Sequence, residues 1–340
     1  LFRTRASQGA GGSPPPKALS KKIIPHLEGN PLAIELAAAR AQDMGAEALL
    51  QALSERFAVL SSEGGRPNRQ ATLRATIDWS WNLLEDWEKS ALSQLSIFRG
   101  GFTMEAATAV LGLNHHPNAP WVLDIIQSLL DHSLLRANKT TDQPRFGLYE
   151  SIREYAGEKL DSNRQELDQR FIAHFAAYGQ PQKRRTLKSG GLPARQMLAE
   201  LENLIHAFEL AILNKDEKAL FCFLAVYDAF ERLGSISLIQ DLSPKLLKLN
   251  LSPEDAAAVS LKTSFAHIVA GQLDQAKVLI DTALTTANKW QDEALIGEAL
   301  FLLATVQLQQ GLIHQSIATG TTSIEMASKA NQLRMVALAQ

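Results

Sequence analysis

The feature that most constrains the fold is a 40-residue repeat near the C-terminal end of the sequence. Residues 271–276 (Gly-Gln-Leu-Asp-Gln-Ala) align with residues 311–316 (Gly-Leu-Ile-His-Gln-Ser). The same offset superposes Leu284 on Ile324, Ala287 on Ala327, Leu295 on Met335 and Ala299 on Ala339. A period of this length, with small residues at matching positions and a glycine in the turn, is typical of stacked helical hairpins. The sequence therefore predicts paired helices, with Gly311 closing one hairpin turn.

The N-terminal part also has helical periodicity, interrupted by Gly-, Pro- and Ser-rich connectors at residues 9–16 and 61–68. Helices are expected at residues 1–7, 17–28, 31–42 and 46–57. From residue 163 onward the pattern is again helical, with residues 180–193 as the long interruption.

Between these two helical parts, residues 69–160 contain the order of elements found in a winged helix. Four helices are expected at residues 72–84, 86–98, 104–111 and 121–130. Two strands, residues 133–137 and 145–149, flank a polar stretch suited to a hairpin tip, and Glu150 begins another helix. This part of the chain is therefore predicted to carry one small β-hairpin in a mainly α protein.

A winged helix raises the hypothesis of DNA binding, so its candidate recognition helix matters. Residues 121–132 contain no Lys or Arg, and their only full charges are Asp124 and Asp131. Contacts to phosphates and base edges draw mainly on Arg and Lys, and the DNA backbone repels aspartate. We therefore expect this helix to pack against protein and to make no direct contact with nucleic acid.

A sharp corner at Gly29-Asn30-Pro31 is the candidate binding site. Gly29 is suited to end a helix, Asn30 to cap the next helix, and Pro31 to occupy a first turn that needs no N–H donor. Leu32, Leu36 and the alanines that follow predict a thin helix that lies close to neighbouring backbone. The Pro31 ring and the turn amides would then form an edge that can meet a flat ligand. An ordinary corner between two helices is the open alternative.

Three segments resemble one family in order and spacing. They are the corner with its helix, Gly29-Asn30-Pro31-Leu32-Ala33-Ile34-Glu35; residues 70–84 with 95–102; and residues 148–156, Leu-Tyr-Glu-Ser-Ile-Arg-Glu-Tyr-Ala. They are similar to the region behind the ATPase core of the signal-transduction NTPases with numerous domains (STAND), a class that includes NB-ARC proteins and AfsR-like and MalT-like regulators. The resemblance is close over residues 1 to about 215. Beyond that, the repeats resemble a tetratricopeptide-like array.

The resemblance implies a domain plan. Residues 1–60 would be the helical lid of an NTPase, residues 61–160 the winged helix, residues 161–250 a helical linker, and residues 251–340 truncated tetratricopeptide-like repeats. The expected fold is thus mainly α: a helical subdomain and a winged helix, followed by an α-solenoid.

The resemblance also implies the site residues. In this family the proline of the Gly-x-Pro motif packs on adenine, which carries over to Pro31, with Gly29 and Asn30 as turn formers. NB-ARC members carry a Met-His-Asp triplet whose His approaches the nucleotide phosphate, and the matching positions here are Leu148, Tyr149 and Glu150. Because Tyr149 cannot carry a positive charge at pH 7, phosphate sensing at this position is in doubt.

The composition narrows the class of protein. A net charge of −2 and a pI near 6.5 provide no global field for a nucleic acid or an anionic membrane. The single cysteine, Cys222, lies in an apolar run too short to cross a bilayer, which favours a buried, reduced thiol and a cytoplasmic location. Since the chain begins at Leu1 inside a helical pattern, we expect a fragment of a longer protein.

No catalytic constellation is found in the sequence. Residues 11–18 contain glycines and a lysine, but three prolines remove the N–H donors of a phosphate loop and Ala18 lacks the hydroxyl for magnesium. The histidines have no partner at metal-ligand spacing, and no Gly-x-Ser-x-Gly motif occurs. We expect the chain itself to be no enzyme and to bind no cofactor alone.

The resemblance to the STAND class implies that this chain is the regulatory and sensor portion of an ATPase switched between ADP and ATP. ATP or ADP would bind only with an upstream NTPase core in cis, a protein or small-molecule inducer would bind the repeats, and oligomerisation would accompany the ATP-bound state. No membrane partner is expected. The alternative is a passive helical scaffold for protein interactions, with no nucleotide role; a DNA-binding winged helix is the third and least favoured hypothesis.

Overall fold

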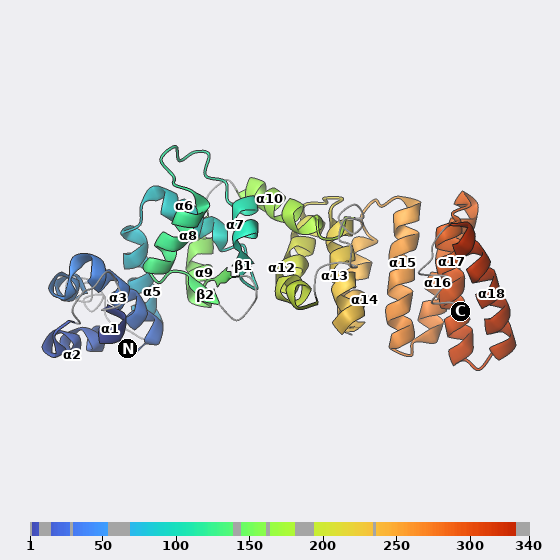
Figure 1. Ribbon diagram of the computed structural model, residues 1–340, viewed down its shortest axis with the longest axis horizontal. Helices are drawn as coiled ribbons and strands as arrows, with labels where there is room; N and C mark the ends of the chain where they lie inside the picture. The colour runs from blue at the N-terminus through green and yellow to red at the C-terminus, as the bar shows by residue number, and fades with distance from the viewer. Residues whose placement is uncertain are drawn as a thin grey trace. The chain divides into compact units, whose positions relative to one another are not determined.

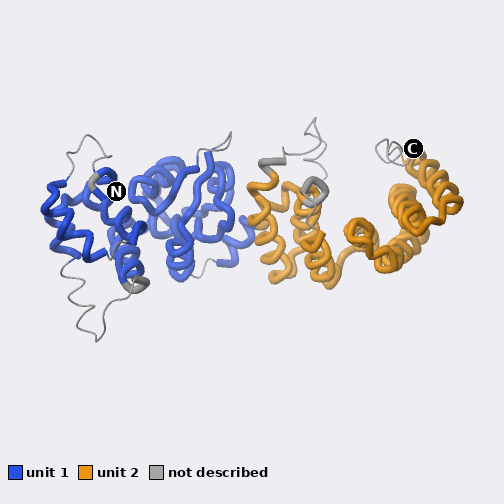
Figure 2. The backbone as a smooth tube through the Cα atoms, turned by 90° about the horizontal axis from the view of Figure 1, so that it is seen from below, with its two compact units in different colours: residues 1–171 blue, residues 172–340 orange. Residues whose placement is uncertain are grey.

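The computed structural model describes residues 2–6, 15–27, 30–53, 69–138, 144–160, 164–180, 194–233 and 236–330. These residues form a mainly α-helical structure with one small sheet, as predicted (Figure 1). The chain divides into two compact units, residues 1–171 and 172–340 (Figure 2). Among the described residues, no helix combines the length and apolar character that a bilayer crossing requires.

The N-terminal helices of the first unit surround a small apolar core. They are α1 (Phe2–Ala6), α2 (Lys17–His26) and α3 (Pro31–Met44), followed by helical residues 46–53. Ala33, Ala37 and Ala38 of α3 are fully buried and pack with Ile23 and Leu49. Because alanine adds little bulk, α1 and α5 (Arg69–Asn82) both lie against α3. The thin helix predicted after Pro31 is therefore confirmed.

The described part of residues 69–158, which we call the α5–α9 region, combines five helices with a three-stranded antiparallel sheet in the order β1-β3-β2. The hairpin β2–β3 is confirmed, with Ala137 opposite Phe146. The elements are α5 (Arg69–Asn82), α6 (Asp86–Leu95), β1 (Phe102–Thr103), α7 (Met104–Val110), α8 (Val122–Asp131), β2 (Arg136–Asn138), β3 (Arg145–Gly147) and α9 (Glu150–Glu158).

Strand β1 was not predicted. It forms because of the residue that precedes it, Gly101. Gly101 has φ +79°, and a Cβ there would lie 2.7 Å from the Phe146 carbonyl oxygen, so only glycine lets this backbone approach β3. The Phe102 ring then packs on Phe146, with ring centroids 6.0 Å apart.

The predicted strand at residues 133–137 was placed too early. Ser133 has φ +58°, and the amides of Leu134 and Leu135 donate to the carbonyl of Leu129, so these residues end α8 before β2 begins at Arg136. Leu134 and Leu135 are both buried. Their apolar character reflects burial in the core, which periodicity alone could not distinguish from strand pairing.

Every regular element in the described part of the second unit is a helix, and the division between the units falls within α10 (Arg164–Ala176). Cys222 lies in helical residues 219–233 and is fully buried, as predicted. The remaining helices are α12 (Ala194–Leu213), α13 (Ala219–Leu233), α14 (Ile236–Leu246), α15 (Pro253–Val269), α16 (Leu273–Trp290), α17 (Glu293–Gln309) and α18 (Ile313–Lys329).

The 40-residue repeat is confirmed in α15 to α18. Helices α15 and α17 begin 40 residues apart, as do α16 and α18. A glycine with positive φ lies in the turn of each hairpin: Gly271 (+74°) between α15 and α16, and Gly311 (+80°) between α17 and α18. The matched residues Ala287 and Ala327 are both buried. The predicted matches at residues 335 and 339 lie outside the described residues.

Candidate functional site

The candidate site begins at the N-terminus of α3, which forms as the sequence predicts. Asn30 has extended backbone angles, and its side-chain Oδ1 accepts hydrogen bonds from the amides of Leu32 (3.0 Å) and Ala33 (3.3 Å). Pro31 occupies the first helical position and is exposed. The N-cap thereby satisfies two amides that have no partner inside the helix. Gly29, the third predicted residue of this corner, lies outside the described residues.

Tyr149, predicted from a motif far along the chain, lies against this same helix. It precedes α9 as the N-cap residue, and its hydroxyl donates a hydrogen bond of 3.2 Å to Oε2 of Glu35 across 114 positions of sequence. Glu35 follows Pro31 by one helical turn. The structure therefore brings two of the predicted positions to one helix, with Glu35 as the link between them.

Glu35 was not singled out from the sequence, although a signal was present. It is the one carboxylate in residues 31–40, in a helix otherwise lined by alanine and leucine. A charged residue one turn after the first helical position lies above it on the same face. That spacing could have marked Glu35 as a neighbour of any group that meets the Pro31 edge.

Positive charge surrounds the Tyr149 ring and the Glu35 carboxylate. The Arg136 guanidinium carbon on β2 lies 5.3 Å from the ring centroid of Tyr149, and Arg5 Nη2 of α1 lies 3.5 Å from Glu35 Oε1. Burial raises the pKa of Tyr149 above its ordinary value, and the Glu35 carboxylate raises it further. Tyr149 is thus a neutral donor at pH 7, and the cation beside it is Arg136.

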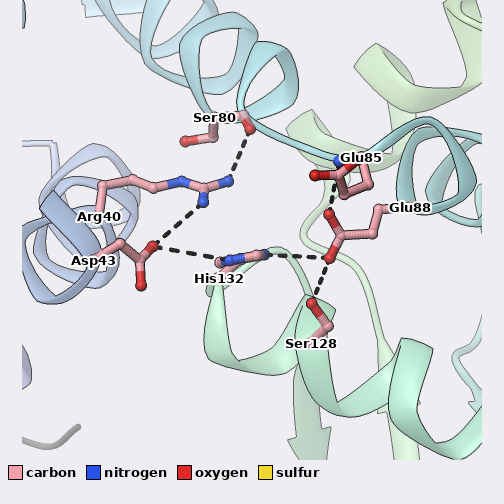
Figure 3. A network of polar contacts seen from close by, with 7 residues as sticks. All are labelled: Arg40, Asp43, Ser80, Glu85, Glu88, Ser128 and His132. Carbon is pink, nitrogen blue, oxygen red and sulfur yellow. Dashed lines mark hydrogen bonds and ion pairs between the residues drawn. The ribbon is translucent and has the colours of Figure 1, made fainter. Parts of the chain in front are cut away.

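A second set of polar contacts holds the C-terminal half of α3 (Figure 3). Arg40 is almost fully buried; its Nη2 donates to the carbonyl oxygen of Ser80 on α5 at 2.8 Å, and its Nη1 lies 3.4 Å from Asp43 Oδ2. Asp43 Oδ2 in turn lies 3.8 Å from Nε2 of His132, which follows α8. This chain of contacts links α3 to both α5 and α8.

The same series of polar contacts extends to α6 through the buried carboxylate of Glu88. Glu88 accepts a hydrogen bond from the Ser128 hydroxyl and one of 2.8 Å from the Glu85 amide, while its Oε1 lies 3.7 Å from His132 Nδ1 (Figure 3). We call Arg40, Asp43, Ser80, Glu88, Ser128 and His132 the α3 junction. It joins α3, α5, α6 and α8.

The α3 junction is electrostatically constrained around His132. Burial lowers the pKa of His132, the Arg40 guanidinium lowers it further, and the carboxylates of Glu88, Asp43 and Asp131 act in the opposite direction. Burial also lowers the pKa of Arg40, which nevertheless stays protonated because its ordinary value is far above 7. His132 is therefore neutral at pH 7.

The contacts of Tyr149 and of the α3 junction position helices of the first unit against one another. No group of three or more His, Cys, Asp or Glu side chains suited to a metal ion occurs within the described part of the chain. The glycines of residues 11–14, tested above as a phosphate loop, lie outside it.

The outward face of α8 has the charge predicted from the sequence. Asp124 and Asp131 are exposed, whereas Ile125, Ile126 and Leu129 point into the core. Sequence reasoning missed how strongly apolar this face is at its start: Trp121 is 84% exposed and Leu123 is 61% exposed. An exposed tryptophan beside acidic residues suits contact with protein better than contact with a polyanion.

Comparison with known proteins finds proteins named as transcriptional regulators that are similar to part of this chain. No family model matches the sequence. Proteins of Mycobacterium tuberculosis and Mycobacterium bovis that carry the name HTH-type transcriptional regulator are 38% identical over 159 residues, which cover 46% of this chain and 18% of theirs. A further protein of Mycobacterium tuberculosis, whose name gives no function, is 34% identical over 143 residues, covering 42% of this chain and 36% of its own.

Among solved structures, a STAND protein with a tetratricopeptide repeat sensor from Pyrococcus horikoshii aligns with all of this chain and 60% of its own. The TM-score is 0.34 and the identity 12%; a score of this size does not establish a shared fold. The chain spans less than a fifth of the relatives named as regulators. Over slightly less than half its length, it is thus similar in sequence to mycobacterial proteins named as transcriptional regulators.

Proposed function

We propose that this chain is the regulatory and sensor portion of a STAND-type ATPase that switches between ADP and ATP and serves a bacterial transcriptional or signalling regulator. An NTPase core in cis would hold the nucleotide, with Pro31 packed on the adenine. The helices α1–α3 would act as a lid and the α5–α9 region as a winged helix. The repeats α15–α18 would bind a protein or small-molecule inducer.

The observation that carries this proposal is the hydrogen bond between Tyr149 and Glu35. Tyr149, one of the two motif positions that the family resemblance links to nucleotide, bonds to Glu35, which is 114 residues away in the sequence and one helical turn after Pro31, the other motif position. A passive scaffold gives no reason for these two positions to converge. The mycobacterial relatives named as transcriptional regulators support a regulatory output.

The charges at this site suit different roles for Tyr149 and Arg136. Tyr149 is neutral, so it suits the role of a positioning residue that holds the α5–α9 region on α3. Arg136 lies over its ring and carries the positive charge that a phosphate requires. In this proposal Arg136 takes the phosphate-contacting role that a histidine has in NB-ARC proteins.

The switch would be a shift between a closed state with ADP and an open state. Moving such an equilibrium from about 1:99 to about 99:1 requires roughly 5.5 kcal/mol of differential binding. One hydrogen bond supplies about 0.5 to 1.5 kcal/mol. A partner that buries a surface of the repeats is therefore the more suitable source of the difference.

The test uses this chain expressed as one polypeptide with the proposed NTPase core. Pro31→Ala and Arg136→Gln are each expected to weaken ADP binding, Arg136→Gln by about tenfold to a hundredfold because it removes a charge-assisted hydrogen bond. Calorimetric titration with ADP measures both effects. Leu32 to Arg40 should remain helical in both variants, since neither change touches the Asn30 cap.

The control is Tyr155→Phe, which removes the hydroxyl of a buried tyrosine within α9. Its hydroxyl donates to Asp78 Oδ1 at 2.5 Å and faces α5. We expect this variant to bind ADP as the wild type does. Unchanged ADP affinity in Pro31→Ala and Arg136→Gln would favour the passive scaffold, and tight ATP binding by residues 1–340 alone would contradict the need for an upstream core.

A further inference from the structure

Two surfaces of the first unit complement each other and do not belong to the proposed nucleotide site. One is the outward face of α8, formed by Trp121, Leu123, Asp124, Gln127 and Asp131, which we call the acidic face. The other is the outward face of α2, which we call the basic face. It consists of Lys17, Ala18, Lys21, Lys22, Ile24 and Pro25.

The acidic face lies in a stretch of chain that has no basic residue other than histidine. From residue 100 to residue 135 the sequence carries Glu105, Asp124 and Asp131 but no Lys or Arg. Trp121 and Leu123 are the two most exposed large apolar side chains of the first unit among the described residues. Tryptophan is enriched among the residues that dominate protein interfaces. This face therefore suits a partner that offers apolar side chains and positive charge.

The basic face supplies that chemistry within the same chain. Helix α2 carries three lysines and no carboxylate in its ten residues, and Ile24 is 38% exposed on the same side as Lys17 and Lys21. At 3.6 residues per turn, positions 17, 21 and 24 lie along one face. An apolar residue thus follows two positive charges.

The order of these groups matches when the two helices run antiparallel. Along α2 the order is Lys17, Lys21 and Ile24. Along α8, read from its C-terminal end, it is Asp131, Asp124 and then Trp121 just before the helix. The flexible lysine side chains can reach either aspartate, while Ile24 meets the tryptophan ring. Opposite charges then face each other and the apolar groups meet at one end.

We propose that α2 of one copy of this chain docks on the acidic face of α8 in a second copy, without nucleotide and independently of the proposed switch. Because the two faces differ, the contact is heterologous, and each copy can offer both. A helix laid on a helix buries less than the roughly 1,200 Å² typical of stable complexes. The association is therefore weak and strongly dependent on salt.

The first measurement is sedimentation of the 340-residue chain over a range of concentrations. We expect a concentration-dependent rise in average mass at about 50 mM salt that is largely lost at about 500 mM, where the Debye length falls from about 14 Å to about 4 Å. A chain that stays monomeric across the range at low salt would overturn the proposal.

Charge reversal identifies the surfaces. Asp124→Lys with Asp131→Lys, and separately Lys17→Glu with Lys21→Glu, are each expected to weaken self-association by about tenfold, the effect of losing two favourable exposed ion pairs. All four side chains are exposed, so both variants should keep the circular dichroism and melting temperature of the wild type. Mixing the two variants restores complementary faces and should restore association.

The matched control makes the same change of net charge elsewhere. Asp274→Lys with Asp281→Lys alters two exposed aspartates of α16 in the second unit. This variant should associate like the wild type. If it weakens association as much as the α8 variant does, or if the mixture of the two charge-reversed variants stays monomeric, α2 and α8 are not the docking surfaces.

Discussion

Replacing Arg40 with methionine tests the α3 junction. Methionine keeps most of the length and apolar volume of the arginine stem but removes the guanidinium that contacts Ser80 and Asp43. The Ser80 carbonyl belongs to the last turn of α5, where carbonyl groups lack helical partners, so Arg40 serves as the donor that caps it. In the variant this carbonyl loses its hydrogen bond with Arg40.

The size of the effect follows from three contributions. A hydrogen bond from a charged donor contributes about 1.5 to 3 kcal/mol. The pair with Asp43 adds little, because the Asp43 side chain is 52% exposed and such pairs contribute about 1 kcal/mol or less. Removing a buried charge recovers part of its desolvation cost. We therefore expect a net loss of about 1 to 3 kcal/mol in the free energy of unfolding of the first unit.

Tryptophan fluorescence during urea unfolding measures this loss, because four of the five tryptophans, at positions 79, 81, 87 and 121, belong to the first unit. Arg74→Met is the control: it removes an ion pair with Glu158 whose side chains are 60% and 50% exposed, and should leave stability near that of the wild type. An Arg40→Met variant as stable as the wild type, or more stable, would refute the capping argument.

The same variant has a second readout in the titration of His132. Arg40 lowers the pKa of His132, so its removal should raise that pKa, as measured by the imidazole proton resonance in NMR. Because the folded pKa of His132 lies below its unfolded value near 6.5, the unfolded chain binds the proton more tightly, and stability falls as the pH drops below about 6.5. This loss should be smaller in Arg40→Met. An unchanged or lower His132 pKa would show that Arg40 does not act on the ring.

Three further experiments test the sheet, the α3 cap and the burial of Cys222. Gly101→Ala should destabilise the first unit by about 2 kcal/mol or more, because it combines positive φ with a Cβ that meets the Phe146 carbonyl oxygen. Gly45→Ala, at φ +83° with no atom within 4 Å of the added Cβ, should cost about 1 kcal/mol, and urea unfolding measures both losses. Asn30→Ala should remove about 1 kcal/mol and increase amide exchange at the start of α3, as measured by mass spectrometry; unchanged exchange would exclude the cap. Cys222, whose pKa burial raises to about 12, should resist iodoacetamide at pH 8 until urea unfolds the chain, and rapid labelling of the folded protein would contradict its burial.

The sequence predicted those parts of the fold that local patterns determine. The 40-residue period specified the helices α15 to α18 because each hairpin repeats the same packing positions, and Asn30 with Pro31 specified the start of α3 through hydrogen bonding and a fixed φ. Strand β1 escaped prediction because two residues have no periodicity. Its pairing depends on Gly101 approaching β3, a contact more than 40 residues away in the sequence.

The candidate site was predictable only at its two ends. Motifs identified Pro31 and Tyr149, but nothing local in the sequence indicated that Tyr149 would bond to Glu35. The α3 junction was likewise invisible, because Arg40, Glu88 and His132 come from three segments whose contact is a property of the packed helices. Such long-range polar contacts depend on tertiary packing, which no single segment encodes.

A double-mutant cycle on ADP dissociation from this chain joined to its proposed NTPase core tests the central proposal, that Tyr149 acts on a nucleotide through Glu35 of α3. Glu35→Met, which keeps the side-chain length but has no acceptor oxygen, and Tyr149→Phe would be compared singly and together, with the release of a fluorescent ADP analogue followed by stopped flow. The account predicts that each single change speeds release and that the double variant is no faster than the faster single variant, since both remove the same hydrogen bond. Release rates equal to that of the wild type in all three variants would contradict it.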